Sequence, residues 1–526
     1  MKKLYSFICF VTLSACFVIG ACFSPIDDNR GEGAISVRLP GKDKVPIKQS
    51  AGSFVPMNRT AISPEAINSF LYELTFSGSR GGAIVMTAGY GETVSIQVLP
   101  GLWNVSVRAF DPENSAKIRA IGEAESIDVI AGKESIVLIK MAVYTEVFTW
   151  SDTTPAGPGL KEALEEGEFY DEIIMVKGNI ATTSGVAINR NKKVTITGEN
   201  ATVTMSGTGS LFTIGVNLEM VLKNITLQGN AGNNAPMVTV NGGKLVLQSG
   251  GKIIGNTFTP TTNWRGGAGV FLDGGTLEIA GGEVSGNTLL GSTVNLMGAG
   301  IYVMNGGNIL MSSGVIRNNR VYRLVPGDNG SRGGGVSLYQ NSNFEMTGGI
   351  IEDNIIDNGS TSGASTALGG GVSVYTGCSF IFKGGTIRNN ECVVVNSNAA
   401  GGSRGGGVSC EDGSFMMQGG FVNGNRVSHP TNPNTAYGAF GGGIFIGLGT
   451  FEKTGGIVYG NEVTGNDADG IPFANTAQSD SGGLGGGHSV AISINTGWSV
   501  DRRRNTTSWA NNNMDGNVSG PVGGWE

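Results

Sequence analysis

Histidine and charged residues are scarce in this chain. Only two of its 526 residues are histidine, His429 and His488, and they are not placed as a pair. Charged residues make up 15% of the chain, where about 25% is usual. The net charge is −7 and no run of Lys or Arg occurs, so the basic surface that nucleic acid or an anionic membrane would require is missing. The sequence excludes a nucleic-acid partner and suggests no histidine-based catalysis.

Cysteine is also rare. Beyond the N-terminal segment only Cys378, Cys392 and Cys410 occur, and three is an odd number with no zinc-like spacing. Cys410 falls in a column of aliphatic residues, so we expect it to be a small buried hydrophobe. Cys378 is predicted at a corner and Cys392 in a loop. We assign no metal, no cofactor and no catalytic residue.

Glycine, in contrast, is abundant, with 88 residues against only 16 prolines and no collagen period. The glycines mark a repeat that ends in asparagine at Asn256, Asn287, Asn319, Asn354, Asn390, Asn425 and Asn461, spaced by 31 to 36 residues. Between the last Gly of each GGG-like element and the Asn, the count stays at 18 or 19, and a polar loop takes up the variation. A fixed core with a variable insertion predicts a solenoid.

The repeat core alternates apolar and polar residues with the period of a strand. Equivalent positions form four columns: Val270, Ile301, Val336, Val372, Val408, Ile444; Leu272, Val303, Leu338, Val374, Cys410, Ile446; Leu277, Ile309, Phe344, Phe380, Phe415, Phe451; and Val284, Ile316, Ile351, Ile387, Val422, Val458. Like residues stacked at about 4.8 Å per rung are what a parallel β-helix needs. The recurring Asn can pass side-chain hydrogen bonds from rung to rung, and Gly supplies the corners.

Repeated Gly-Gly-[Ile/Val/Thr] followed a few residues later by Asn resembles polymorphic outer-membrane-protein-type surface proteins and, more broadly, pectin-lyase-like right-handed β-helices. The resemblance implies a right-handed parallel β-helix, which we place over residues 146–496. Counting the repeats and the strands before them predicts about eleven rungs, and residues 497–526, rich in Asn, Gly and Arg, are expected to be a C-terminal cap or tail. It does not imply an activity, because this fold includes lyases, hydrolases, adhesins and inert passengers.

The first residues indicate secretion. Lys2 and Lys3 precede an apolar run to Ala21, typical of a signal peptide over residues 1–21. The stretch ending in Cys22 resembles the lipobox of bacterial lipoproteins, which implies lipidation of Cys22. Cys16 also fits but leaves a shorter apolar run, and an ordinary signal peptide is the remaining alternative. The resemblance implies a lipidated tether (22–33), with the protein anchored by lipid to the outer membrane at the cell surface.

In residues 34–145 apolar and polar residues alternate in short runs that are separated by Gly/Pro turns. This pattern predicts an antiparallel β-sandwich. The stretch from Leu99 to Asp111 resembles immunoglobulin-like or transthyretin-like modules, and Trp103 is expected in the core. A short helix over 159–166 is expected to cover the open end of the β-helix. The predicted fold class is therefore all-β, a sandwich followed by a β-helix.

Catalytic carboxylates on this fold would have to project outward from neighbouring rungs. Glu278 and Glu345 project outward two rungs apart, a spacing more typical of a solvated face. Arg265, Arg332 and Arg404 each precede Gly-Gly in alternate rungs. They could bind acidic glycans, although such side chains more often cover a neighbour.

The insertions all leave from one corner, so we expect them to stack on one edge, where recognition usually lies. The candidate binding residues are Tyr322, Arg332, Arg404, His429 and Tyr437. The sequence thus predicts a surface-displayed lipoprotein that acts as an adhesin or binding scaffold for a host protein or glycan. A polysaccharide lyase or glycosidase and a structural surface-coat protein are the alternatives, and an enzyme is not favoured.

Overall fold

A computed structural model shows a nearly all-β protein, with 62% strand and 2% helix, so the predicted all-β class is confirmed. The structure describes residues 32–39, 70–79, 82–111, 114–139, 141–151, 158–166, 171–189, 192–263, 265–291, 295–323, 330–359, 366–394, 402–429, 439–447, 449–459, 466, 468–470, 475–479, 490–493, 500–503 and 518–519. Cys22, Tyr437, Asn461 and His488 lie outside these residues. The described chain forms two compact units.

The first unit contains residues 71–107 and 123–139 together with the first strand of the chain. In one sheet β1 (Gly33–Arg38) lies between β4 (Thr93–Val98), which is antiparallel to it, and β7 (Glu134–Leu138), which is parallel. A second group pairs β2 (Leu71–Gly78) with β3 (Ile84–Ala88) and with β5 (Gly101–Asp111). Strand β6 (Asn114–Val129) follows β5. The β1–β4 and β2–β3 pairings are antiparallel and the β1–β7 pairing is parallel. The predicted β-sandwich over residues 34–145 stays a prediction.

Side chains in the first unit alternate between buried and exposed. Along β5, Trp103, Val105 and Val107 are buried while their neighbours are not. The Trp103 indole Nε1 donates a hydrogen bond to the Leu99 carbonyl at 2.9 Å. Because the ring is buried and the indole N–H has a hydrogen-bond partner inside the protein, Trp103 is a core residue, as predicted.

The second unit begins its parallel stack at β8 (Ala142–Val147), which pairs with β9 (Glu172–Val176). Between them lies α2 (Leu160–Glu166), whose Leu160, Ala163 and Leu164 are fully buried in the same core as the first strands of the stack. A seven-residue helix has little stability alone, so these apolar contacts hold it. The helix covers the start of the core, as the sequence predicts.

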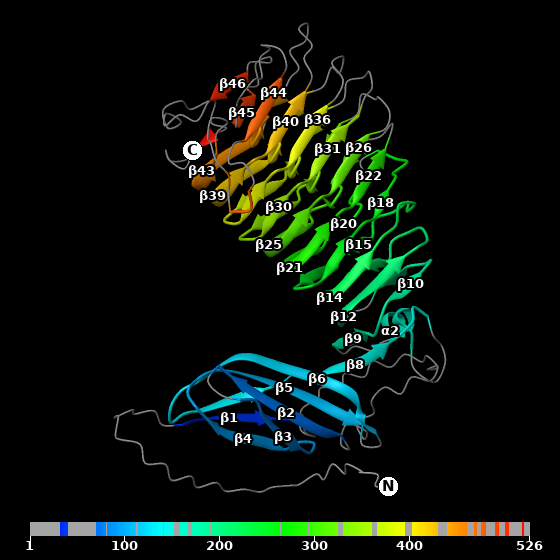
Figure 1. The fold of residues 1–526 in the computed structure, drawn as a ribbon, viewed down its shortest axis with the longest axis vertical. Helices are drawn as coiled ribbons and strands as arrows, with labels where there is room; N and C mark the ends of the chain where they lie inside the picture. The colour runs from blue at the N-terminus through cyan, green and yellow to red at the C-terminus, as the bar shows by residue number, and fades with distance from the viewer. Residues whose placement is uncertain are drawn as a thin grey trace, which may run out of the picture. The chain divides into compact units, whose positions relative to one another are not determined.

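The rest of this unit is a parallel β-solenoid of about eight turns, against the eleven rungs predicted. Its strands follow one another along the stack in chain order (Figure 1). One wall consists of β11 (Val186–Ile188), β13 (Phe212–Ile214), β15 (Val238–Asn241), β20 (Val270–Asp273), β24 (Ile301–Met304), β28 (Val336–Leu338), β33 (Val372–Val374), β38 (Val408–Cys410), β42 (Ile444–Ile446), β45 (Val490–Ser493) and the antiparallel β46 (Val500–Arg503).

The other walls come from the second and third strands of each rung. They are β10 (Ile180–Thr182), β12 (Lys192–Met205), β14 (Leu218–Gln228), β16 (Lys244–Gln248), β17 (Lys252–Ile254), β21 (Thr276–Ser285), β25 (Asn308–Arg317), β29 (Asn343–Met346), β30 (Ile350–Glu352), β34 (Ser379–Phe382), β35 (Thr386–Arg388), β39 (Ser414–Asn423), β43 (Thr450–Val458) and β47 (Val518–Ser519).

All four predicted columns are confirmed by the strand register. The Val270, Leu272, Leu277 and Val284 columns pair rung on rung as expected, and their members are buried. Phe380 is stacked between Phe344 and Phe415, with ring centroids 4.7 and 5.1 Å away. Offset aromatic stacking at this spacing adds to the burial of each ring.

The asparagine ladder is also present and fully buried. From Asn319 to Asn425 the side-chain Oδ1 accepts two hydrogen bonds from the preceding ladder Asn, one from its backbone N–H and one from its Nδ2. Asn287 Oδ1 accepts only the backbone N–H of Asn256, whose Nδ2 donates to the Ala235 and Ala268 carbonyls. For Asn354, these bonds from Asn319 measure 3.1 and 2.9 Å. The Nδ2 of Asn354 donates to the Ile316 carbonyl and to Asn390 Oδ1, each at 2.9 Å. The amide of Asn354 is therefore completely satisfied without water.

One member of the predicted ladder is wrong. The residue that bonds to Asn425 is Asn475, whose Oδ1 accepts from the Asn425 backbone N–H at 3.0 Å and from Asn425 Nδ2 at 2.9 Å. Asn461, chosen by the regular 36-residue spacing, therefore does not take this position. Asn475 stands 50 residues after Asn425, so hydrogen-bond geometry rather than spacing identifies the ladder residue.

The GGG element allows the chain to re-enter the next rung. Gly369, the first glycine of one such element, has a φ of 72°, which side chains rarely adopt. A Cβ there would lie 2.2 Å from the Val372 carbonyl oxygen. The third glycine, Gly371, passes close to the ladder, because a Cβ would lie 3.1 Å from the amide of Asn390. Both the conformation and the close approach require glycine.

The sequence suggested that the insertions are polar loops, but in the structure they contain strands. After each ladder Asn the chain forms an outgoing strand, and a returning strand leads back to the GGG element. The outgoing strands stack as one parallel sheet: β18 (Thr257–Phe258), β22 (Thr288–Gly291), β26 (Arg320–Arg323), β31 (Ile355–Asn358), β36 (Glu391–Val394), β40 (Arg426–His429) and β44 (Thr476–Ser479). The returning strands form another: β19 (Arg265–Gly266), β23 (Leu296–Met297), β27 (Ser331–Arg332), β32 (Ala367–Leu368), β37 (Ser403–Arg404) and β41 (Ala439–Phe440).

These two sheets, which we call the wing, enclose a hydrophobic core separate from that of the solenoid body. Leu289, Val321, Ile356, Cys392 and Val427 point into it from successive outgoing strands. Cys392 therefore occupies a strand and a core position rather than the predicted loop. The insertions stack on one edge, as predicted, because each outgoing strand completes the backbone hydrogen bonds of the one below.

We expect Asn354→Ala to lower the free energy of unfolding by about 3 kcal/mol, because the backbone N–H and the Nδ2 of Asn319 would lose their acceptor inside the protein. The measurement is urea or thermal denaturation followed by circular dichroism. Asn343→Ala is the matched control, since Asn343 also bonds to an Asn one rung below, at 3.1 Å, but on the exposed face. Equal losses for the two variants would contradict the role of the buried ladder.

Candidate functional site

The outer face of the outgoing sheet bears polar side chains that interact across rungs. The Arg320 guanidinium forms an ion pair with Asp357 one rung above it and lies 4.5 Å from the centre of the Tyr322 ring. Farther along the stack, Arg426 Nε lies 3.4 Å from Glu391 Oε1. Tyr322, a predicted binding residue, therefore lies on this outer face, packed against Arg320.

A concave corner forms where the outgoing sheet leaves the third strand of each rung. The residue before each ladder Asn from Asn256 to Asn425 has a positive φ: Gly255, Gly286, Asn318, Asp353, Asn389 and Gly424. Gly, Asn and Asp adopt this conformation at low cost, which explains why these three types occupy the six positions. The residue after each ladder Asn begins the outgoing strand. Residues from the positions before and after the ladder Asn therefore flank the ladder at this corner.

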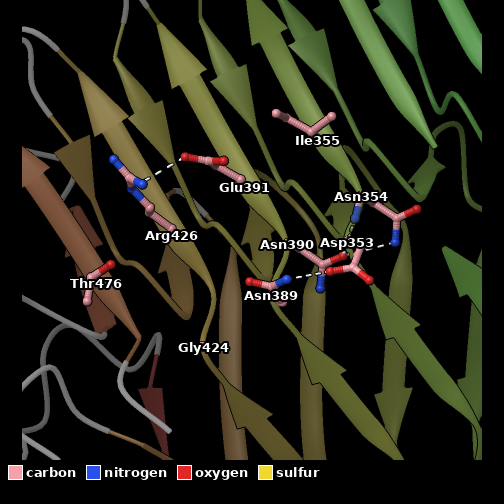
Figure 2. Close-up of a pocket in the computed structure, with 9 residues that line it drawn as sticks. All are labelled: Asp353, Asn354, Ile355, Asn389, Asn390, Glu391, Gly424, Arg426 and Thr476. Carbon is pink, nitrogen blue, oxygen red and sulfur yellow. Dashed lines mark hydrogen bonds and ion pairs between the residues drawn. The ribbon is translucent and has the colours of Figure 1, made fainter. Parts of the chain in front are cut away.

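A pocket of about 460 Å³ lies in this corner, which we call the corner pocket. Figure 2 shows its lining side chains, which come from three consecutive rungs and from β44. The lining residues are Asp353, Asn354, Ile355, Asn389, Asn390, Glu391, Gly424, Arg426 and Thr476. Within it Asn389 Nδ2 donates a hydrogen bond to the Asp353 carboxylate one rung below, parallel to the Arg426–Glu391 ion pair.

The electrostatics of the corner pocket differ between its carboxylates. Burial raises the pKa of Glu391, the positive charge of Arg426 opposes this, and the negative charge of Asp357 adds to it. Beside the pocket, Arg388 pairs with Glu352 at 2.7 Å and with Asp469 at 2.6 Å. Because Arg388 is compensated by two carboxylates, it adds little positive potential to the pocket.

Arg332 and Arg404 lie on the returning sheet, apart from Tyr322 on the outgoing sheet. The Arg332 guanidinium lies 4.8 Å from the centre of the Tyr375 ring. That of Arg404 lies 5.2 Å from the Phe445 ring and 3.6 Å from the Glu411 carboxylate. Both cover neighbouring aromatic rings, which is a packing role, and their role in binding stays a prediction.

Arg265 is not in the same column as these two arginines. In the strand register Arg265 aligns with Leu296 and then Ser331, one residue away from Arg332. The cause is a sequence offset: Arg265 stands five residues before Val270, whereas Arg332 stands four before Val336. The column contains Arg332 and Arg404 with Leu368 between them.

Of the remaining predicted residues, His429 ends β40, and only its backbone is described. Tyr437 lies outside the described residues, between β40 and β41, and Cys22 also lies outside them. The sequence analysis missed Asp353, Asn389, Glu391 and Arg426. They could have been found, because they stand immediately before or after the ladder asparagines, where the chain turns.

The outward carboxylates Glu278 and Glu345 behave as a solvated face, as expected. Glu278 pairs with Lys244 at 2.9 Å and Glu345 with Lys383 at 2.8 Å. The three described thiols are buried, and burial raises the pKa of Cys378 to about 11, that of Cys410 to about 12 and that of Cys392 still further. Thiols with raised pKa values are poor nucleophiles at neutral pH.

Among the residues that the structure describes, no group of three or more His, Cys, Asp or Glu side chains could hold a metal ion. Within the same residues, no helix has the length and apolar character to cross a membrane. No protein-family model matches this chain, and no significant match exists among curated proteins or solved structures. The corner pocket and the wing are therefore interpreted from their own chemistry.

Two partly buried carboxyls, Glu391 and Glu283, should have opposite pH effects on stability. Because the pKa of Glu391 is raised, its stabilising contribution exists below its unfolded pKa of about 4.3 and is lost as the pH rises through the folded value. Replacing it by Gln removes this loss. We therefore expect Glu391→Gln to become more stable relative to the wild type as the pH rises from about 4 to about 7.

Glu283 is the matched control. Burial alone would raise its pKa, but hydrogen bonds from Ser285 and Arg317 and the charges of Arg317 and Lys252 outweigh burial and lower it. The Glu283 carboxylate therefore stabilises the fold above its unfolded pKa, and this stabilisation is lost as the pH falls. Glu283→Gln should become less stable relative to the wild type as the pH rises from about 4 to about 7. Thermal denaturation across pH measures both, and trends of the same sign would contradict the assignment.

Proposed function

We propose that this protein is a surface-displayed bacterial lipoprotein that binds a partner, a host protein or glycan, through the wing. The observation that supports this most is that the insertions form two stacked sheets with a core of their own. A segment that only connected rungs would not need a second core. Building recognition side chains onto strands holds them in position before the partner arrives, which lowers the entropic cost of binding.

The wing presents side chains of the kind that dominate interfaces. Tyr322 and Arg320 lie on its outer face, and Tyr and Arg are enriched among residues that contribute most to binding. In the chain, residues 360–365 stand between the outgoing strand β31 and the returning strand β32, and residues 395–401 stand between β36 and β37. Tyr437 belongs to a third segment of this kind, 430–438, and His429 ends the strand that leads into it.

The same proposal assigns the N-terminal region to anchoring. Residues 1–21 act as a signal peptide, Cys22 is lipidated in the outer membrane, and residues 22–33 form a tether. The N-terminal strands act as a sandwich-type spacer, and the solenoid that follows is right-handed. Residues 497–526 form its C-terminal cap or tail.

A glycosidase or lyase is the second candidate, favoured by one observation. Asp353 and Glu391 line the same corner pocket, and burial raises the pKa of Glu391, as a general acid requires. Release of reducing or unsaturated sugar from a polysaccharide, lost in Glu391→Gln, would establish this activity.

We expect replacement of residues 360–365 and 395–401 by Gly-Ser linkers of equal length to reduce adhesion to host cells or matrix about tenfold or more, because binding would lose several contacts. Far-UV circular dichroism and the melting temperature should stay unchanged, since the strands on either side remain. A Glu345→Gln/Lys383→Gln double variant removes an exposed ion pair from a body wall and serves as the control. Undiminished adhesion of the linker variant would overturn the proposal.

The anchor is tested separately. Cys22→Ser should abolish incorporation of radiolabelled palmitate and release the protein from the outer-membrane fraction, because one peptide tether without acyl chains has no membrane affinity. Cys16→Ser is the control and should leave both unchanged. Continued labelling of Cys22→Ser together with loss in Cys16→Ser would move the lipidation site to Cys16.

A further inference from the structure

Most of the side chains that line the corner pocket are hydrogen-bonding groups. Asp353 and Glu391 supply carboxylates, Asn389 an amide and Thr476 a hydroxyl, and none of the lining residues is aromatic. A nucleobase or another flat ring would find no stacking surface there. A ligand that fits must be bound through hydrogen bonds, and the acceptors favour a ligand with many donors.

The charge of the pocket argues against strongly charged ligands. The negative charge of Glu391 is offset by Arg426 at 3.4 Å, and its raised pKa weakens it further. Phosphate or sulfate groups would be repelled by Asp353. A cationic partner would meet Arg426. Hydroxyl groups satisfy the carboxylates and the amide without a net charge.

The polar groups are held in place before a ligand binds. Asn389 bonds to Asp353 across one rung and Arg426 pairs with Glu391 across the next (Figure 2). The two cross-rung pairs follow the direction of the stack, at about 4.8 Å per rung. A ligand with groups repeating along an extended chain matches this direction better than a compact one.

We propose that the corner pocket binds the hydroxyl groups of a neutral oligosaccharide whose chain lies along the stack of rungs. This inference rests on the proposed function and deepens it, by choosing a glycan over a host protein as the partner. The carboxylates of Asp353 and Glu391 accept hydrogen bonds from sugar hydroxyls, and Ile355 offers a small apolar contact to the ring face.

The test is binding of the purified protein to an array of neutral and acidic glycans and to oligolysine, with hits measured by calorimetry. We expect at least one neutral oligosaccharide to bind. Asp353→Asn and Glu391→Gln should each weaken it about tenfold, the equivalent of one hydrogen bond to a charged group. Glu345→Gln, which alters a carboxylate paired with Lys383 on another wall, is the matched control and should bind like the wild type.

The inference would be overturned if the protein bound only acidic glycans or oligolysine. It would also be overturned if Asp353→Asn, Glu391→Gln and Glu345→Gln bound the neutral oligosaccharide with equal affinity. Circular dichroism of Asp353→Asn and Glu391→Gln excludes misfolding as the cause of a loss. Failure of this inference is distinguishable from failure of the proposed function. If the protein adheres to host cells but binds no neutral glycan, only the inference fails, and if it does neither, both fail.

Discussion

The buried asparagine ladder is the interaction on which the rest of this structure depends. Each ladder amide has two donor hydrogens and one acceptor oxygen, and in Asn354 and Asn390 all of them are used inside the protein. Hydrogen bonds are directional, so the ladder permits only one rise and one register between rungs. The apolar columns supply most of the favourable free energy of burial, but a column of Val or Ile alone would tolerate sliding.

The ladder also decides where the wing and the corner pocket lie. From Asn256 to Asn425 a residue with positive φ stands immediately before each ladder Asn, and the outgoing strand begins immediately after it. The chain may then travel any distance, because the GGG element returns it to the next rung. The variable insertion thus begins directly after the buried ladder Asn. Residues on both sides of the ladder line the corner pocket.

The distribution of charged groups separates the corner from the body walls. On the wall of second strands, Glu278 and Glu345 pair with lysines and are ordinary surface groups. At the corner, Glu391 is less accessible, with 28% of its side chain exposed, and lies in a pocket with a second carboxylate. Partial burial strengthens electrostatic and hydrogen-bonding interactions relative to open solvent, which is why the corner rather than the wall suits recognition.

The solenoid could be predicted from the amino-acid sequence, because each rung repeats the same local pattern of side chains and the four columns from Val270 to Val458 can be read directly from it. The ladder up to Asn425 followed from the same repeat. Only the tertiary structure decided that Asn475 replaces Asn461, that the insertions are strands, and that Asp353, Asn389, Glu391 and Arg426 meet in one pocket. Periodicity records which side chains face inward within a rung. Where a chain returns after a long excursion, and which side chains then meet, depends on hydrogen bonds and packing between rungs that no single repeat contains.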